Sequence, residues 1–280
     1  MSPTLVHTTS PIRVDTHAHV FHTDLPMVAG RRYTPAANAT VADYLAELDR
    51  HQLSHGILIQ PSFLGTDNSH MLAAIATAWP RLRGIAVIDA HTPIAALNAL
   101  AKAGIVGIRF NLVGAPLPDL TNPAWQAILA HLRALDWQVE LHGSVDQLIA
   151  LMPALLAHQL KVVIDHFGRP QYFDALVQDH AYFGLLAMAA TSGLVWFKLS
   201  GLYRICTDPA EQFTFVSTVV PLLLKRLGPE RLLWGSDWPH TQFEAQVTFA
   251  ATMAQLFDWL PDEGLRTTIL NQTPQSLFNL

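Results

Sequence analysis

The stretch Val14-Asp15-Thr16-His17-Ala18-His19-Val20 decides how the rest of this chain is interpreted. It continues an apolar run that starts at Ile12, so we expect it to form the end of a first β-strand. Alternate residues of a strand point to the same face, which places the two histidines side by side. Two imidazoles on one face can bind one metal ion, or can hold one polarised carbonyl oxygen or phosphate without a metal.

Composition favours one globular domain that acts on a small molecule. The chain has 280 residues, of which 50% are hydrophobic and 14% are charged, so we treat 1–280 as one domain. The net charge of -5 gives no argument for a nucleic-acid or membrane-surface partner. The single cysteine, Cys206, excludes an internal disulfide and fits a reducing compartment. Because 1–13 lacks the pattern of a signal peptide and no apolar run is long enough to span a membrane, we expect a cytoplasmic protein. Whether copies of the chain associate stays open.

Apolar runs typical of buried strands alternate with helical patterns along the whole chain. After the opening stretch, strands are predicted over 57–59, 85–88, 106–110, 137–141, 162–164, 194–199 and 232–234. Helical patterns begin near residues 40 and 92 and cover 68–79, 121–135, 144–158, 172–190, 209–227 and 244–259. Eight strand–helix units in one domain of about 250 residues predict a single (β/α)8 barrel, the TIM barrel. An open doubly wound sheet would need a Gly-rich turn after the first strand, and none is present.

Polar residues recur where the predicted strands end. In a barrel of this kind the carboxyl ends of the strands form the active site, so we expect these side chains to converge. In chain order they are His17, His19, Ser62, Arg109, Asn111, His142, His166, Ser200, Arg204 and Asp237, with Tyr33 in the long loop after the first strand. The histidines elsewhere are assigned to structure or surface: His7, His51, His55, His70, His131, His158 and His180.

The residue types at these strand ends indicate hydrolysis. An aspartate such as Asp237 that faces imidazoles can take a proton from water. The imidazoles, or a metal that they hold, can polarise a carbonyl and stabilise the oxyanion. Arg109 offers a bidentate contact to a carboxylate. Structural roles remain open beside these: Asp237 can cap a helix, Arg109 can pair with a barrel carboxylate, and His142 and His166 can be core residues.

Short motifs in a fixed order give the chain a family resemblance. They are Arg32-Tyr33-Thr34-Pro35, Gln60-Pro61-Ser62, Gly107-Ile108-Arg109-Phe110-Asn111, Asp165-His166-Phe167-Gly168-Arg169-Pro170, Lys198-Leu199-Ser200-Gly201 and the run from Trp234 to Pro239. With the paired histidines and Asp237, they resemble the amidohydrolase superfamily (amidohydrolase-2 type). Within it, they look like the 2-pyrone-4,6-dicarboxylate lactonase branch, with its sugar-lactone and muconolactone hydrolases and isomerases.

The resemblance implies a lactonase in which Asp237 activates water while His17, His19 and His166 surround the lactone carbonyl. It implies that the rest of the substrate is contacted by Tyr33, Ser62, Arg109, His142 and Arg204. It also favours catalysis without a cofactor. The alternative is one Zn²⁺ held by His17, His19, His142 and Asp237.

Two departures from the family pattern bear on the substrate and the metal. Members with two metal ions bridge them by a lysine or glutamate at the end of strand four, where this chain has the fixed cation Arg109. The dicarboxylate lactonases carry a further arginine shortly after that strand, whereas 112–116 hold no cation. We therefore expect a monocarboxylated or sugar-acid lactone as substrate. The alternatives are a metal-dependent decarboxylase or hydratase, a lactone isomerase, and a non-catalytic small-molecule-binding protein.

One prediction concerns the barrel interior. Alternation along 138–142 and 196–200 turns Glu140 and Lys198 inward if the apolar faces meet the helices. An unpaired buried charge is costly, so we predict that these two side chains meet in an ion pair or a shared polar network.

Overall fold

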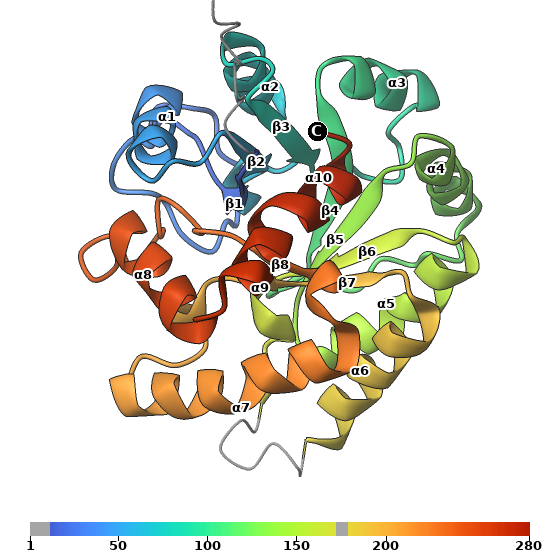
Figure 1. Ribbon diagram of the computed structural model, residues 1–280. Helices are drawn as coiled ribbons and strands as arrows, with labels where there is room; N and C mark the ends of the chain where they lie inside the picture. The colour runs from blue at the N-terminus through green and yellow to red at the C-terminus, as the bar shows by residue number, and fades with distance from the viewer. Residues whose placement is uncertain (1–11, 172–178) are drawn as a thin grey trace, which may run out of the picture.

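The computed structural model describes residues 12–171 and 179–280, which form eight parallel strands ringed by helices (Figure 1). Each strand pairs with the next along the chain, in the order β1 to β8. The strands are β1 Val14–Ala18, β2 His55–Ile59, β3 Leu82–Ala86, β4 Ile105–Asn111, β5 Gln138–His142, β6 Lys161–Ile164, β7 Val195–Leu199 and β8 Leu232–Trp234. The predicted single (β/α)8 barrel is confirmed.

The helices follow the strands in alternation and are fixed by local capping. They are α1 Val41–Arg50, α2 Ser69–Thr77, α3 Ile94–Lys102, α4 Pro123–Ala134, α5 Val145–Ala157, α6 His180–Ser192, α7 Pro209–Leu227, α8 Phe249–Trp259, α9 Glu263–Thr267 and α10 Thr273–Phe278. Thr40 caps α1 by accepting from the Asp43 amide, and Ser144 forms a reciprocal capping box with Gln147 at α5. α10 lies across one end of the barrel, close to the C-terminus (Figure 1).

Several predicted boundaries were wrong. The third strand runs over Leu82–Ala86 and not 85–88, because its pairing with β2 begins at Gly56 opposite Leu82. The last long helix starts at Phe249, capped by Thr248, and not at 244. The predicted helix over 172–190 is seen from His180 onward, and 172–178 lie outside the described residues, as do 1–11 of the segment tested for a signal peptide.

The barrel closes through hydrogen bonds between β1 and the turn after β8. Thr16 Oγ1 donates to the Trp234 carbonyl at 2.8 Å, and the Asp237 amide donates to the His17 carbonyl at 2.8 Å. Gly235 lies so close to β1 that a Cβ there would come within 2.5 Å of the His17 Cβ. The seam therefore needs glycine at this position, and it brings Asp237 beside the paired histidines.

A buried carboxylate, Asp15, reinforces the same seam. Its Oδ1 accepts from the Ser236 amide at 2.8 Å, and its Oδ2 accepts from Ser236 Oγ at 2.5 Å and from Tyr44 OH at 3.0 Å. Burial raises the pKa of Asp15 to about 6, against the opposing effect of these donors. Asp15 thus joins β1, α1 and the turn after β8, and it lies two residues before His17.

The interior ion pair predicted from strand alternation is confirmed. Lys198 Nζ lies 2.7 Å from Glu140 Oε1, and both side chains are 0% exposed. Burial raises the pKa of Glu140 to about 7, and the Lys198 ammonium opposes that rise. The barrel core therefore carries opposite charges from β5 and β7 beneath the strand ends.

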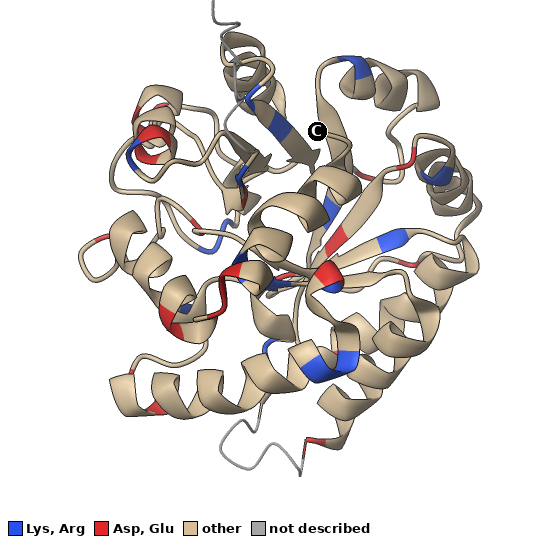
Figure 2. Cartoon of the chain, in the orientation of Figure 1, with Lys and Arg blue, Asp and Glu red and all other residues tan. Residues whose placement is uncertain are grey.

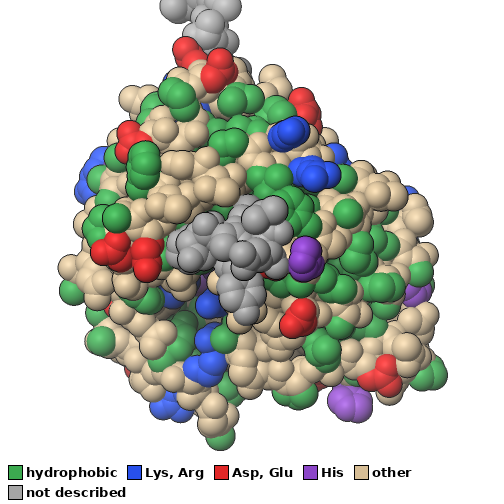
Figure 3. All heavy atoms as spheres, turned by 90° about the horizontal axis from the view of Figure 1, so that it is seen from below, with side chains coloured by type: hydrophobic (Ala, Val, Ile, Leu, Met, Phe, Trp, Pro, Cys, Tyr) green, Lys and Arg blue, Asp and Glu red, His purple; other side chains and the backbone are tan. Residues whose placement is uncertain are grey.

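The outer surface carries charge of both signs. Figure 2 shows acidic and basic residues spread over helices and loops and not collected in one block. On the face in Figure 3, Lys and Arg side chains gather in a short column near the centre, among hydrophobic and acidic side chains. Among the helices of the described part of the chain, none combines the length and apolar character needed to cross a membrane.

Candidate active site

A cavity of about 200 Å³ opens at the carboxyl ends of the strands. Nine of the predicted site residues line it: His19, Tyr33, Ser62, Arg109, Asn111, His142, His166, Arg204 and Asp237. The remaining lining residues are Arg32, Val113, Arg169, Thr241, Gln242 and Phe243. His17 is fully buried and is not part of this lining, but its ring lies 5.1 Å from that of His19 and 4.9 Å from that of His166. The sequence prediction that these side chains converge is thus confirmed, with His17 directly beneath the surface.

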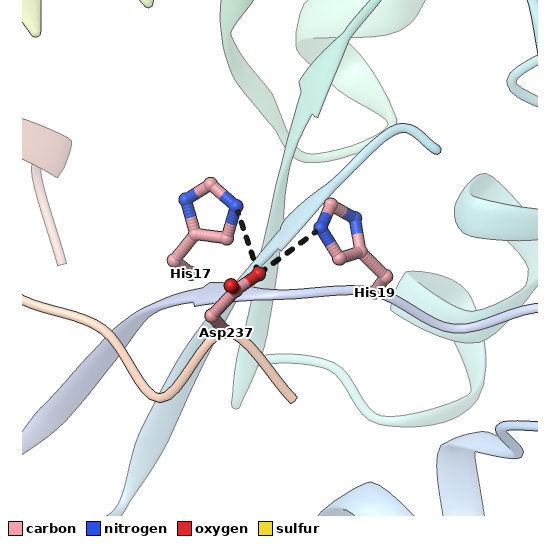
Figure 4. A group of neighbouring side chains, drawn as sticks. All are labelled: His17, His19 and Asp237. Carbon is pink, nitrogen blue, oxygen red and sulfur yellow. Dashed lines mark ion pairs between the residues drawn. The ribbon is translucent and has the colours of Figure 1, made fainter. Parts of the chain in front are cut away.

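The two oxygens of Asp237 have different surroundings. Oδ2 accepts from Arg204 Nε at 2.5 Å and from Tyr203 OH at 2.8 Å. Oδ1 faces His17 Nε2 at 3.8 Å and His19 Nε2 at 3.7 Å, and both rings point toward it (Figure 4). Burial would raise the pKa of Asp237, but the guanidinium of Arg204 holds it well below the usual range. Asp237 is therefore an ionised carboxylate whose Oδ2 accepts hydrogen bonds from Arg204 and Tyr203 and whose Oδ1 faces the two histidines.

His19 is held in a defined tautomer by the backbone of β2. Its Nδ1 lies 2.8 Å from the Ile59 carbonyl oxygen, which can only accept a hydrogen bond. In the neutral ring, Nδ1 therefore carries the proton and Nε2 carries the lone pair. That lone pair faces Asp237 Oδ1, so the two atoms can share a hydrogen-bond donor or a cation between them.

A second cluster of charges lies under the cavity around Asp165. Arg109 donates to Asp165 Oδ2 from Nε at 2.9 Å and from Nη2 at 2.7 Å. Lys198 Nζ lies 3.5 Å, and His17 Nδ1 3.3 Å, from Asp165 Oδ1. Burial would raise the pKa of Asp165, but Arg109 and Lys198 keep it well below its usual range. Arg109 thus pairs with a barrel carboxylate, which was one of the two roles that the sequence left open for it. It also lines the cavity.

His142 and His166 are neutral under ordinary conditions. Burial, with Arg109, lowers the pKa of His142 well below its usual value, and burial lowers that of His166 to about 4. His142 faces Arg109 at 3.2 Å through Nδ1 and Arg169 at 3.4 Å through Nε2. His166 Nδ1 lies 2.9 Å from Ser200 Oγ. Two buried histidines therefore line the cavity in the uncharged form that can polarise a carbonyl.

The turn after β7 leaves room for His166 only because it contains glycine. Gly201 has a φ of +61°, and a Cβ there would lie 2.7 Å from His166 Nδ1. The same turn leads to Tyr203 and Arg204, which hold Asp237. Tyr203 was missed in the sequence, since an aromatic next to a strand end gives no signal of its own.

Four guanidinium groups line the cavity: Arg32, Arg109, Arg169 and Arg204. Arg109 and Arg204 are paired with carboxylates, whereas neither Arg32 nor Arg169 forms an ion pair with any residue that the structure describes. Burial lowers the pKa of Arg169, and Arg204 and Arg32 lower it further, since like charges repel. A cavity wall with two unpaired cations favours an anionic ligand.

The loop after β1 reaches this wall. Tyr33 OH lies 3.4 Å from Thr241 Oγ1, and Arg204 Nη1 donates to the Thr241 carbonyl at 3.1 Å. Ser62 opens a short 3₁₀ turn after β2 and lines the same cavity. Hydroxyl groups thus border the guanidinium groups, as expected for a site that binds an oxygenated ligand.

Two groups of side chains have donor atoms close enough to hold a metal ion. One is His17, His19 and Asp237, and the other is His17, Asp165 and His166. The first has donor atoms placed for a divalent ion, because the His19 Nε2 lone pair and Asp237 Oδ1 converge and the buried His17 Nε2 has no hydrogen-bond partner among the described residues. His142, which the sequence placed in the zinc alternative, belongs to neither group, because both of its nitrogens face guanidinium groups.

Comparison with known proteins agrees with this geometry. A curated 4-sulfomuconolactone hydrolase from Rhizobium radiobacter is 31% identical over 278 residues, 95% of this chain and 89% of that protein. A D-galactarolactone isomerase from Agrobacterium fabrum is 27% identical over 273 residues, 95% of this chain and 91% of that protein. A solved structure of a probable 2-pyrone-4,6-dicarboxylic acid hydrolase from Acinetobacter baumannii with citric acid bound is 39% identical, with a TM-score of 0.91. The match covers 96% of this chain and 99% of the Acinetobacter chain. The amidohydrolase family model matches residues 14–280, and this chain belongs to that family.

Proposed function

We propose that the protein is a lactone hydrolase whose substrate carries two anionic groups. The observation that carries the proposal is the asymmetry of Asp237, whose Oδ2 is held by Arg204 while Oδ1 faces His19 at the base of an arginine-lined cavity. An ionised carboxylate with one free oxygen is suited to take a proton from water. The lactone hydrolase among the relatives supports the same reaction class.

In the proposed reaction, Asp237 Oδ1 and His19 Nε2 hold the attacking water. The 3.7 Å between them allows one water to donate a hydrogen bond to each at about 2.8 Å. Asp237 takes a proton as the water oxygen bonds to the lactone carbonyl carbon, and the neutral His166 polarises the carbonyl oxygen. The ring C–O bond then breaks, and the proton passes to the departing ring oxygen, which leaves a hydroxy acid.

The four arginines that line the cavity favour a different substrate from the one expected from the sequence alone. The stretch 112–116 holds no cation, which alone favoured a monocarboxylated or sugar-acid lactone. Arg32 and Arg169 enter the cavity from other loops and supply two unpaired guanidinium groups. We therefore assign two acidic groups to the substrate, and the citric acid in the solved relative is consistent with such a wall.

A bound metal ion would share Asp237 and His19 with the attacking water. If zinc is bound, His17, His19 and Asp237 would hold it, and it would supply a Lewis acid that polarises the carbonyl and acidifies water. We propose that catalysis proceeds without it, because Arg204 and Lys198 lie against two of these three side chains and repel a dication. A decarboxylase or hydratase, the alternative from the sequence, would need the metal.

The test is a panel of lactones assayed with chelator-treated and zinc-loaded protein. The panel contains 2-pyrone-4,6-dicarboxylate, a carboxylated muconolactone and aldonolactones. We expect hydrolysis of a dianionic lactone by the chelator-treated protein, with one oxygen from ¹⁸O-labelled water in the product. A product with no label and an intact ring would indicate a lactone isomerase, as in the Agrobacterium relative. Activity restricted to the zinc-loaded protein would overturn the metal-free assignment.

A further inference from the structure

We propose that Lys198 is a positioning residue that holds His17 as the Nε2–H tautomer and thereby disfavours zinc at His17, His19 and Asp237. The inference rests on the site proposed above, but not on the identity of the substrate. It concerns a side chain from β7 that is 0% exposed and is not among the residues that line the cavity.

The contact between Lys198 and His17 fixes the direction of one hydrogen bond. Lys198 Nζ lies 3.3 Å from His17 Nδ1 in hydrogen-bonding geometry. An ammonium group has only donors, so Nδ1 must accept and must carry the lone pair. A ring whose Nδ1 carries a lone pair cannot be the doubly protonated imidazolium, so the ring is neutral. A neutral ring with its lone pair on Nδ1 carries its proton on Nε2.

The competing tautomer would need Asp165 as its partner. Asp165 Oδ1 lies 3.3 Å from the same His17 Nδ1, but no described group forms a hydrogen bond with that oxygen. A proton on Nδ1 would therefore point at a poorly aligned acceptor and would also meet the Lys198 ammonium. Lys198 is in turn fixed by Glu140 at 2.7 Å, so its place beside His17 is set by the buried ion pair.

The tautomer decides what the space beside Asp237 can hold. With the proton on Nε2, His17 offers a donor, while His19 Nε2 and Asp237 Oδ1 offer acceptors. A water molecule satisfies that set, because it can accept one hydrogen bond and donate two. A zinc ion requires a lone pair from each ligand, so His17 can bind it only after the proton moves to Nδ1. Lys198 opposes that move.

The experiment combines nitrogen NMR with zinc binding, and neither measurement involves a lactone. The tautomer of His17 is read from ¹⁵N–¹H correlations of histidine-labelled, chelator-treated protein, with His17→Gln to assign the signals. Zinc affinity is measured by titration calorimetry on the wild type, on Lys198→Met combined with Glu140→Gln, and on Glu140→Gln alone. The last variant is the matched control, since it keeps Lys198 and a hydrogen-bond acceptor for it.

We expect the Nε2–H tautomer in the wild type and in the control, and the Nδ1–H tautomer in the double variant. We expect zinc to bind the double variant roughly tenfold or more tightly than the other two, as for second-layer changes at metal sites. An Nδ1–H signal in the wild type would overturn the proposal, and so would equal zinc affinity in all three proteins. If the double variant fails to fold, the wild-type spectrum still decides. If the substrate panel shows no lactone hydrolysis, the tautomer of His17 and the zinc affinities still decide this proposal.

Discussion

At the scale of single residues, Asp237 combines two tasks through its two oxygens. The Oδ2 contacts with Arg204 and Tyr203 fix the carboxylate and keep it ionised, and Oδ1 remains available for proton transfer. The residue adopts a φ of +59°, a left-handed conformation that aspartate and asparagine tolerate better than most residues. Asparagine can therefore adopt the same backbone conformation, but its amide cannot take a proton from water as the carboxylate does.

Asp237→Asn should keep the fold and lower kcat at least ~100-fold, the lower end for loss of a general base. Arg204 will retain the amide oxygen at the Oδ2 position, which turns the NH2 group toward His19 and removes the proton acceptor. The measurement is steady-state hydrolysis of the best lactone, with Asp24→Asn, an exposed carboxylate, as control. Near-normal turnover by Asp237→Asn would move the base elsewhere, with His142 as the next candidate.

The unpaired arginines give a second prediction at this scale. Arg169→Met or Arg32→Met should lower kcat/KM for a dianionic lactone roughly ten- to a hundredfold, because a charge-assisted hydrogen bond contributes about 1.5–3 kcal/mol. The loss should be smaller for a monoanionic lactone, which needs fewer of these contacts. Arg31→Met is the matched control, since Arg31 is exposed, bonds to Thr34 and does not line the cavity. Equal losses of kcat/KM on both substrates would show that these side chains do not bind the second anionic group.

At the scale of elements, the seam between β1 and β8 positions the site. The strand that carries His17 is joined to the turn that carries Asp237 by backbone bonds and by Asp15. A shift of either element would separate Asp237 Oδ1 from the histidines by more than the small distances on which proton transfer depends. Stability and catalysis are therefore coupled at this seam.

Asp15→Ala should destabilise the protein by about 3 kcal/mol or more, since it strands buried donors that each cost about 1–3 kcal/mol when unpaired. These donors are the amide and hydroxyl of Ser236, the hydroxyl of Tyr44 and the amide of His17. Chemical denaturation followed by circular dichroism provides the free energy of unfolding. Asp119→Ala removes an exposed carboxylate that bonds to Thr121 and should have a much smaller effect. A comparable loss in both variants would argue against a special role for the seam.

At the scale of the whole molecule, the buried titratable groups set how stability depends on pH. The pKa of His166 is lowered to about 4, so the unfolded chain binds more protons between pH 4 and 6.5, and stability falls as pH falls through that window. This one residue contributes about 3 kcal/mol over the window. His17 and His142, with pKa values well below the usual one, act in the same direction, and so does His240, whose pKa burial lowers to about 4.

Two buried acids act in the opposite direction. The pKa of Glu140 is raised to about 7 and that of Asp15 to about 6, so each loses stability as pH rises from about 4 toward those values. Each contributes about 3 kcal/mol, which His166 and His240 together match, and His17 and His142 add to the histidine side. We therefore predict that Tm rises from pH 4.5 to pH 6.5, and calorimetry at intervals of one pH unit measures it. A flat or falling Tm over this range would mean that the buried acids dominate.

The sequence by itself determined the alternation of strands and helices, the barrel and the residues at the strand ends. These features depend on periodicities of 2 and 3.6 residues and on capping, which are local properties of the chain. The same local rule placed Glu140 and Lys198 inside the barrel, where they pair. Strand and helix ends were less well predicted, since strand pairing and not local preference sets where β3 begins.

Only the tertiary structure decided how the site residues are partnered. Arg109 was expected at the substrate, but its pairing with Asp165 depends on the register between β4, β5 and β6. The entry of Arg32 and Arg169 into the cavity depends on loop paths that no periodicity encodes. The tautomer of His17 follows from one lysine 181 positions away in the chain. Hydrogen-bond direction and charge pairing act over a few ångströms in space, so they become defined only when the barrel closes.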